Sequence, residues 1–389
     1  MRSTPVTASD AVPVIGRPGR AGPAFWVAVV LLISPCWFAV HPWLLGASWH
    51  FLVLGARLLV GLAPGGGLHL YARHPDLQIG PLSFLVAVPF LALPADAGRV
   101  LAVAAMTVGG VGAVTVLARL STGDRSRRWR RGVLAGAAAA PGWLELATRA
   151  GHLDDVLAIL LGVAALTQRT RHRSVPAGLL AAAAADAKPW ALAFAPLLVD
   201  PDVPVRTQVR AAVGYGLLLA AAWLPFLLAD HATVSAARFS IRDAPSSALR
   251  ALGVTARRTP RWDRPAQVLL GSVAGLVATL RRRPGAVLLV AVAARILLDP
   301  SVFPYYTGGL LIAAAAFDLL ETTWYAPVTT IAFVVAVYLP HYALYQGVVL
   351  HHGGSAAAGG LRAAVCLLAI AVALLTPTAL LRPPAVSAD

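Results

Sequence analysis

Long apolar runs, broken by short arginine-rich stretches, fill nearly the whole chain of 389 residues. The windows 24–46, 100–118, 211–229 and 361–381 approach or exceed the ~20 apolar residues that cross a bilayer as an α-helix. No long polar region is left that could form a separate soluble domain. The pattern therefore predicts an all-α, polytopic membrane protein.

Arginine-rich loops indicate the orientation of this protein in the membrane. The strongest is RLSTGDRSRRWRRG (119–132), and the next are 169–173, 206–210 and 281–283. Loops rich in Lys and Arg stay on the cytoplasmic side. Counting the short apolar stretch 79–94 as a span would place the strongest of these loops outside. We therefore predict that 79–94 forms a helix that lies in the outer interface and does not cross the membrane.

With this choice the chain is predicted to cross the membrane about twelve times, with both termini in the cytoplasm. A single transmembrane domain, 24–381, is flanked by polar cytoplasmic tails at 1–23 and 382–389. The two predicted spans that meet at Lys188 could also be one broken helix. The predicted spans lie near 24–46, 98–118, 132–148, 154–168, 175–187, 190–200, 211–229, 266–280, 284–298, 305–320, 326–340 and 361–381.

This topology gives the outer side a large first loop at 47–97 and a basic loop at 230–265. Shorter outer loops are expected at 149–153, 299–304 and 341–360. The polar residues that could carry chemistry gather in these loops and at the span ends beside them. A functional site is therefore expected to face outward.

Composition supports the membrane interpretation and excludes one alternative. Hydrophobic residues make up 58% of the chain and charged residues 13%, against about a quarter charged in soluble domains. The net charge of +15 does not indicate a nucleic-acid partner, because the basic residues lie in short runs between apolar segments. Lys188 is the only lysine, which together with the Ala-rich runs suggests a GC-rich bacterial genome and a bacterial cell membrane. Cys36 and Cys366 are far apart in apolar segments and indicate neither a disulfide framework nor a metal motif.

The first outer loop contains an isolated carboxylate. Asp76 is the only acidic residue between Asp10 and Asp96. A carboxylate at the membrane surface could act as a general base that takes a proton from an attacking hydroxyl. Alternatively, Asp76 could cap a helix that begins near Ile79, since acidic side chains are favoured at helix N-termini.

Two further constellations lie at predicted span ends. Asp154 and Asp155, with His152, could bind a metal or orient a sugar, or the two carboxylates could satisfy free N–H groups of the next helix. Asp186 and Lys188 end an Ala-rich span, where ionisable groups are costly and usually functional. An ion pair of Lys188 with Asp154 or Asp155 is the structural alternative.

The loop 237–265 is unusually basic for an outer loop. Arginines there could bind phosphate groups, whose oxygens match the guanidinium fork, or anionic lipid headgroups. Near the next outer turn, Asp299 could cap the turn, and Tyr305 and Tyr306 could be interface anchors. The loop arginines are Arg238, Arg242, Arg250, Arg257, Arg258, Arg261 and Arg264. Three histidines of the last outer loop, His341, His351 and His352, carry too little context to assign.

Four stretches, in their order and spacing, carry a resemblance to a known family. They are HPDLQIGPLSFL (74–85), GHLDDVLAILLGVAAL (151–166), AGLLAAAAADAKPWALAFAPLLV (177–199) and RILLDPSVFPYY (295–306). Through most of residues 24–320 the chain resembles the C-type (GT-C) membrane glycosyltransferases, in particular glycosyltransferase family 87, the polyprenyl-phosphate-mannose-dependent mannosyltransferases. The resemblance implies a GT-C-like helical bundle with interfacial helices in the first outer loop. It also implies transfer of a sugar, mannose in the family, from a polyprenyl phosphate to a lipid or glycan acceptor, with inversion.

The resemblance also implies roles for particular residues. Asp76 would be the catalytic base, while Lys188 and loop arginines such as Arg238 and Arg242 would hold the phosphate. Asp154 and Asp155 would orient hydroxyl groups. The expected substrate-binding set is completed by His74, Asp299, Tyr305 and Tyr306. No cofactor is expected, a divalent metal is left open, and the expected partners are the donor, the acceptor and membrane lipids.

Two features depart from the family, and two other functions are weighed against the enzyme. Family members often carry an acid early in the first outer loop, where VHPWLLGASWH (40–50) has none, and many have a histidine where this chain has Tyr305-Tyr306. The alternatives are a lipid or glycan transporter or flippase and a non-catalytic relative. A transporter needs ionisable groups near mid-span on several helices. Here they lie mostly at outer ends, with Asp318 and Arg295 as exceptions, which favours the enzyme.

Overall fold

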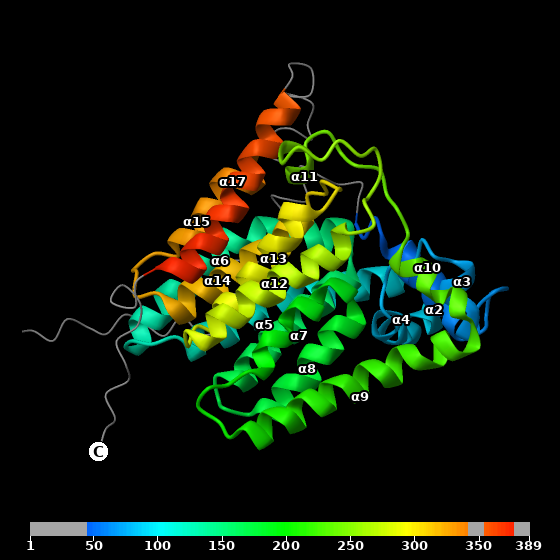
Figure 1. The fold of residues 1–389 in the computed structure, drawn as a ribbon, viewed down its shortest axis with the longest axis horizontal. Coiled ribbons are helices and arrows are strands. Elements are labelled where there is room, and N and C mark those ends of the chain that lie inside the picture. Colours follow the sequence, from blue (N-terminus) through cyan, green and yellow to red (C-terminus); the bar gives the residue numbers. More distant parts are fainter. Residues whose placement is uncertain (1–44, 341–353, 377–389) are drawn as a thin grey trace, which may run out of the picture.

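The computed structural model describes residues 45–340 and 354–376, and these residues are helical throughout apart from turns and loops (Figure 1). Within them the only extended pairing is one isolated backbone bridge between Arg242 and Arg258. The prediction of an all-α protein is therefore confirmed. The predicted first span, Cys36 and the three histidines of the last outer loop lie wholly or almost wholly outside the described residues.

Three helices are long and apolar enough to cross a membrane by length and composition. They are α5 (Ala95–Leu120), α9 (Val205–Ala229) and the segment Ala356–Leu375 of α17 (Gly354–Leu375). At 1.5 Å per residue, twenty helical residues reach about 30 Å, the thickness of the hydrocarbon layer. These helices indicate a membrane protein, while the count of twelve spans stays a prediction.

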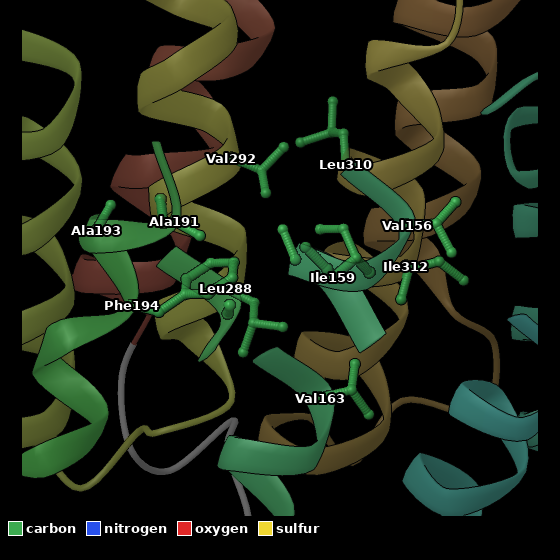
Figure 2. Close-up of a cluster of buried hydrophobic side chains, with 14 of the residues drawn as sticks. Val156, Ile159, Val163, Ala191, Ala193, Phe194, Leu288, Val292, Leu310 and Ile312 are labelled. Carbon is green, nitrogen blue, oxygen red and sulfur yellow. The ribbon is translucent and has the colours of Figure 1, made fainter. Parts of the chain in front are cut away.

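The centre of the bundle is formed by two helices that are buried on nearly every side. In α13 (Ala286–Leu298) and α14 (Tyr306–Glu321) almost all side chains are inaccessible to solvent. Figure 2 shows Val292, Leu310 and Ile312 from this pair meeting side chains of α7 (Leu153–Arg169). A helix that is apolar all round belongs inside a larger bundle.

Around this pair lie α6 (Arg125–Leu144), which continues into the π-helical turn η3 (Glu145–Ala150), and α12 (Asp263–Leu280). Small residues allow α5 to pack closely on its neighbours. A Cβ on Gly110 would lie 2.2 Å from Nε1 of Trp143, so the missing side chain lets α5 and α6 approach each other closely. The remaining short elements are η1 (Gly67–His69), η5 (His231–Thr233), α10 (Val234–Ala237), α11 (Ala248–Ala251), α15 (Val328–Phe333) and η6 (Val334–Tyr338).

The Ala-rich span breaks at Lys188, as one of the two sequence interpretations allowed. Helix α8 (Ser174–Ala187) ends there, and the 3₁₀ helix η4 (Pro189–Leu198) begins at the next residue. Lys188 is extended, with φ −147° and ψ 117°, because a following proline disfavours the helical conformation. Ten residues at about 2 Å rise give η4 about 20 Å, so this helix is shorter than the hydrocarbon layer, and most of it is buried in the core.

The stretch 47–97, predicted to be the first outer loop, contains a compact set of short helices at one end of the molecule (Figure 1). They are α2 (Trp49–Leu59), α3 (Leu70–Arg73), α4 (Pro81–Ala87) and the 3₁₀ helix η2 (Val88–Ala92). The predicted interfacial stretch 79–94 corresponds to α4 and η2, which together are too short to span a bilayer. The residue before α4 is Gly80 and not Asp76, so the interpretation of Asp76 as a helix cap is wrong.

Candidate functional site

A cavity of about 980 Å³ lies where several helix ends meet, and it has two chemically different parts. The ends of η4, α12, α13 and α14 supply charged and aromatic side chains, while α9 and the body of α12 supply an apolar wall. This volume is that of a pocket for a small organic ligand. A second pocket of about 40 Å³ between α5 and α6 has no charged lining residue. The larger cavity is therefore the candidate site.

A buried ion pair fixes Arg295, one of the cations that line the cavity. Arg295 Nη1 lies 2.6 Å from Asp155 Oδ1, and Trp190 Nε1 donates to the same oxygen at 2.7 Å. The guanidinium of Arg295 also lies over the rings of Trp190 and Tyr306, 4.7 and 4.3 Å from their centroids. Arg295 is therefore held in place by a carboxylate and two aromatic faces, and its remaining N–H donors are left for other partners.

A second ion pair lies beside the first. Lys188 Nζ donates to Asp154 Oδ2, so the ion-pair alternative for Lys188 is confirmed. Asp154 is fully buried behind Lys188, and Lys188 itself lines the cavity. His152 precedes α7 as its N-cap residue, with Nδ1 3.4 Å from Asp154 Oδ1 and its ring stacked on Tyr305 at 3.9 Å.

The two adjacent carboxylates therefore bond cations of other helices. The metal alternative rests on His152, Asp154 and Asp155, whose ligand atoms lie within 4.8 Å of one another and could hold an ion. In this arrangement both carboxylates are already bonded, to Lys188 and Arg295 respectively. Just before α7, Arg149 donates to Glu145, four residues earlier in the chain.

The loop that contains Asp76 is fixed against the Lys188 end of α8. Gly80 N and Ser83 Oγ each donate to Ala187 O at 3.0 Å. A Cβ on Gly80 would lie 1.6 Å from Asp186 O, so only glycine allows this approach. The contact places Leu77 and Gln78 on the cavity wall.

Asp76 and His74, in the same loop, do not line the cavity. Asp76 is exposed and His74 is half-buried, whereas the neighbouring Leu77 and Gln78 reach the cavity wall. The role of Asp76 as base therefore stays a prediction from the resemblance.

Among the loop arginines, Arg264 reaches the cavity. Its Nη2 donates to Gln78 Oε1 and, at 2.8 Å, to Phe239 O, which joins the basic loop to the first outer loop. Arg238 and Arg242 are exposed and are not among the residues that line the cavity. The structure thus brings Asp155, Lys188, Asp299, Tyr305 and Tyr306 of the predicted set together, with Asp154 directly behind them.

Sequence reasoning missed Asp263. This residue begins α12, is fully buried, lines the cavity, and accepts a hydrogen bond from Gln267 Nε2 at 2.9 Å. Burial, with a further contribution from the negative charge of Asp299, raises the pKa of Asp263 to about 7. The available signal was an acid between arginines at the start of an apolar run, in RWDRP (261–265).

Asp299 caps a turn, as the sequence suggested, and also faces the cavity. Ser301 N donates to Asp299 Oδ1 at 2.8 Å, and Arg295 Nε is 3.9 Å from Asp299 Oδ2. Burial raises the pKa of Asp299, and the charge of Arg295 opposes that rise. Two cavity carboxyls, Asp263 and Asp299, therefore hold their protons more strongly than an exposed aspartate does.

The apolar wall is formed mainly by one helix. Leu219, Trp223 and Leu227 of α9 line the cavity, and Tyr71 packs on Trp223 with ring centroids 5.0 Å apart. Of the 25 residues of α9, only Ala211 and Phe226 are buried. Figure 1 shows α9 running along one edge of the molecule beside α8. One side of this long apolar helix therefore faces the cavity, and the rest faces outward.

The fold and the site together define a helical membrane protein with an amphiphilic cavity at its helix ends. No family model, no curated protein and no solved structure matches the chain. The site's own chemistry therefore carries the functional argument.

Proposed function

We propose that this protein is an inverting membrane glycosyltransferase that takes a sugar, mannose by resemblance, from a polyprenyl-phosphate donor. The observation that supports the proposal is the cavity itself. It combines Lys188, Arg295 and Arg264 at one end with the apolar wall of α9. A polyprenyl-phospho-sugar has the same two parts, an anionic head and a long apolar tail.

The charges at the polar end suit a phosphodiester. Three cations, Lys188, Arg295 and Arg264, lie beside the two paired carboxylates Asp154 and Asp155. Lys188 and Arg295 are bonded to these carboxylates, whereas Arg264 has no ion-pair partner among the described residues, so its charge is available to an anionic ligand. A phosphodiester carries one negative charge, and guanidinium and ammonium donors bind its oxygens well.

The apolar wall suits the prenyl tail. Trp223 and Leu227 offer an apolar surface along α9, whose opposite side is exposed and apolar. A lipid tail could pass from the bilayer into the cavity along this helix without crossing water.

The reaction needs little from the protein beyond positioning, charge and a base. A phosphate leaves without an acid when cations stabilise its developing charge. An inverting displacement also needs a carboxylate that takes the proton of the acceptor hydroxyl.

We place the site on the outer face of a bacterial cell membrane, in a multi-pass protein with cytoplasmic termini, because the arginine-rich loops would then lie inside. The acceptor is a lipid or glycan hydroxyl.

The test is sugar transfer by the full chain in liposomes. Radiolabelled polyprenyl-phospho-mannose, -glucose and -galactose are supplied with octyl mannoside and mannobiose as acceptors. Wild type should glycosylate one of them. Lys188→Gln should weaken donor binding about 10-fold or more, because a charge-assisted hydrogen bond contributes about 1.5–3 kcal/mol.

Arg282→Gln is the matched control, since Arg282 is exposed and pairs with Asp202 away from the cavity. Movement of the labelled lipid between leaflets without any sugar transfer would instead establish a transporter.

A further inference from the structure

One carboxylate of the cavity differs from the others in its partners. Asp155 is bonded to Arg295, and Asp299 is bonded to Ser301 N with Arg295 nearby. Asp263 is the one acid among the cavity-lining residues that makes no ion pair. A carboxylate that is ion-paired is a weak base, so Asp263 is the strongest base of the three.

The two oxygens of Asp263 are in different situations. Oδ2 accepts the bond from Gln267 Nε2, and Gln267 Nε2 also lies 3.4 Å from Leu298 O at the end of α13. This bond fixes the orientation of the carboxyl group. Oδ1 is buried and has no hydrogen-bond partner. A buried oxygen without a partner is costly, and a ligand hydroxyl in the cavity would remove that cost.

The charged groups around Asp263 set its basicity. Arg264 is the adjacent residue on α12, Asp299 lies at the end of α13, and Asp243 comes from the basic loop. Asp243 is itself paired with Arg250 at 3.2 Å, and Arg362 of α17 acts on Asp299. Burial dominates over these charges and brings the pKa of Asp263 to about 7, where a general base works best at neutral pH.

From this geometry, and on the basis of the proposed glycosyl transfer, we propose that Asp263 is the catalytic general base of the cavity. Oδ1 takes the proton of the acceptor hydroxyl as the acceptor oxygen forms its bond to C1 of the donor sugar. The bond from C1 to the phosphate oxygen breaks, and its electron pair leaves with the polyprenyl phosphate. The proton on Asp263 then passes to solvent, which restores the carboxylate.

The test compares Asp263→Asn and Asp76→Asn with wild type in the liposome assay, using the donor and acceptor on which wild type is most active. Asp263→Asn should lower kcat by about 10²–10⁴-fold with little change in the KM for the donor, since proton transfer contributes that much. Wild-type kcat should rise with pH through about 7. Asp96→Asn is the control, because Asp96 is exposed, pairs with Arg99 and lies outside the cavity.

A second variant keeps the carboxyl and changes only its environment. Gln267→Leu removes the donor to Oδ2, so the pKa of Asp263 should rise further and the ascending limb of the pH profile should move to higher pH. An unchanged profile in this variant would contradict the assignment, and so would full activity of Asp263→Asn. Loss of transfer in Asp76→Asn, with Asp263→Asn active, would return the role to Asp76. If wild type neither binds a polyprenyl phosphate nor transfers a sugar, the proposed function fails and the inference falls with it.

Discussion

Both ends of α7 and η4 bury a carboxylate against an arginine. The end at Asp155, here called the open end, lines the cavity of about 980 Å³, and the end at Asp200, here called the closed end, does not. At the closed end, Asp200 lies 2.6 Å from Arg169 Nη1 and 3.0 Å from His172 Nδ1. At the open end, Asp155 lies 2.6 Å from Arg295 Nη1. The two pairs use the same chemistry at similar depth, so their differences must come from what surrounds them.

The two ends differ in whether the oxygens of their buried carboxylates all have hydrogen-bond partners. Asp200 uses both oxygens, because Oδ2 accepts from Arg169 and His172 while Oδ1 accepts from Asp202 N at 3.0 Å. At the open end, Asp155 Oδ2 and Asp263 Oδ1 are buried without a partner. An ion pair whose oxygens are all hydrogen-bonded holds helices together. Buried oxygens without a partner beside a cavity instead favour binding of a ligand that donates hydrogen bonds to them. The closed end therefore has a structural role, and the open end is the place where chemistry is expected.

The largest expected effect tests this division directly. Arg295→Met and Arg169→Met each leave a buried carboxylate without its cation, so each should lower the free energy of unfolding by about 3–5 kcal/mol. Neutralising the partner, in Arg295→Met/Asp155→Asn and Arg169→Met/Asp200→Asn, should restore most of that loss. Thermal unfolding in detergent measures stability, and polyprenyl-phosphate binding measures the site.

The repaired closed-end variant should bind the lipid as wild type does, while the repaired open-end variant should stay impaired. Equal binding by both repaired variants would remove the functional distinction between the two ends.

A smaller effect is expected at the apolar wall. Trp223→Ala removes part of the surface that α9 presents to the cavity, so binding of a long-chain polyprenyl phosphate should weaken about 10-fold, or ~1.4 kcal/mol. Binding of a short-chain phosphate that does not reach α9 should not change. The control is Leu217→Ala, on the same helix, because Leu217 is 66% exposed and does not line the cavity. The same loss of affinity for both chain lengths would show that Trp223 does not contact the tail.

The contrast between the two ends also separates what sequence could and could not predict. Apolar runs predicted the helices well, since the expected spans 98–118 and 211–229 lie within α5 and α9. Hydropathy works because each helix satisfies its own backbone within a local segment. Lys188 could be identified from the sequence because it is the only lysine in a chain that is otherwise rich in arginine.

The rest of the site depends on contacts between distant positions. Arg295 meets Asp155 across 140 residues, and Arg264 meets Gln78 across 186. Neither pairing leaves a local sequence pattern. The sequence therefore marked Arg295 only as an ionisable residue away from the predicted outer span ends, and it did not identify Asp263. The sequence likewise could not predict which loop arginines line the cavity. Arg238 and Arg264 are the same residue type in the same loop and differ only in how the fold packs them.

The last expected effect is a pH dependence of stability at the open end, measured by comparing Asp263→Asn with wild type. The folded-state pKa of about 7 lies above the value of about 3.9 for an exposed aspartate. Between these values the folded protein holds a proton that the unfolded chain releases, so this group's contribution falls as pH rises and is lost above pH 7. Asparagine keeps the bond with Gln267 and cannot ionise. The melting temperature of Asp263→Asn relative to wild type should therefore rise with pH from 5 to 8. A constant difference would mean that Asp263 is solvated like a surface acid and is not the base of the cavity.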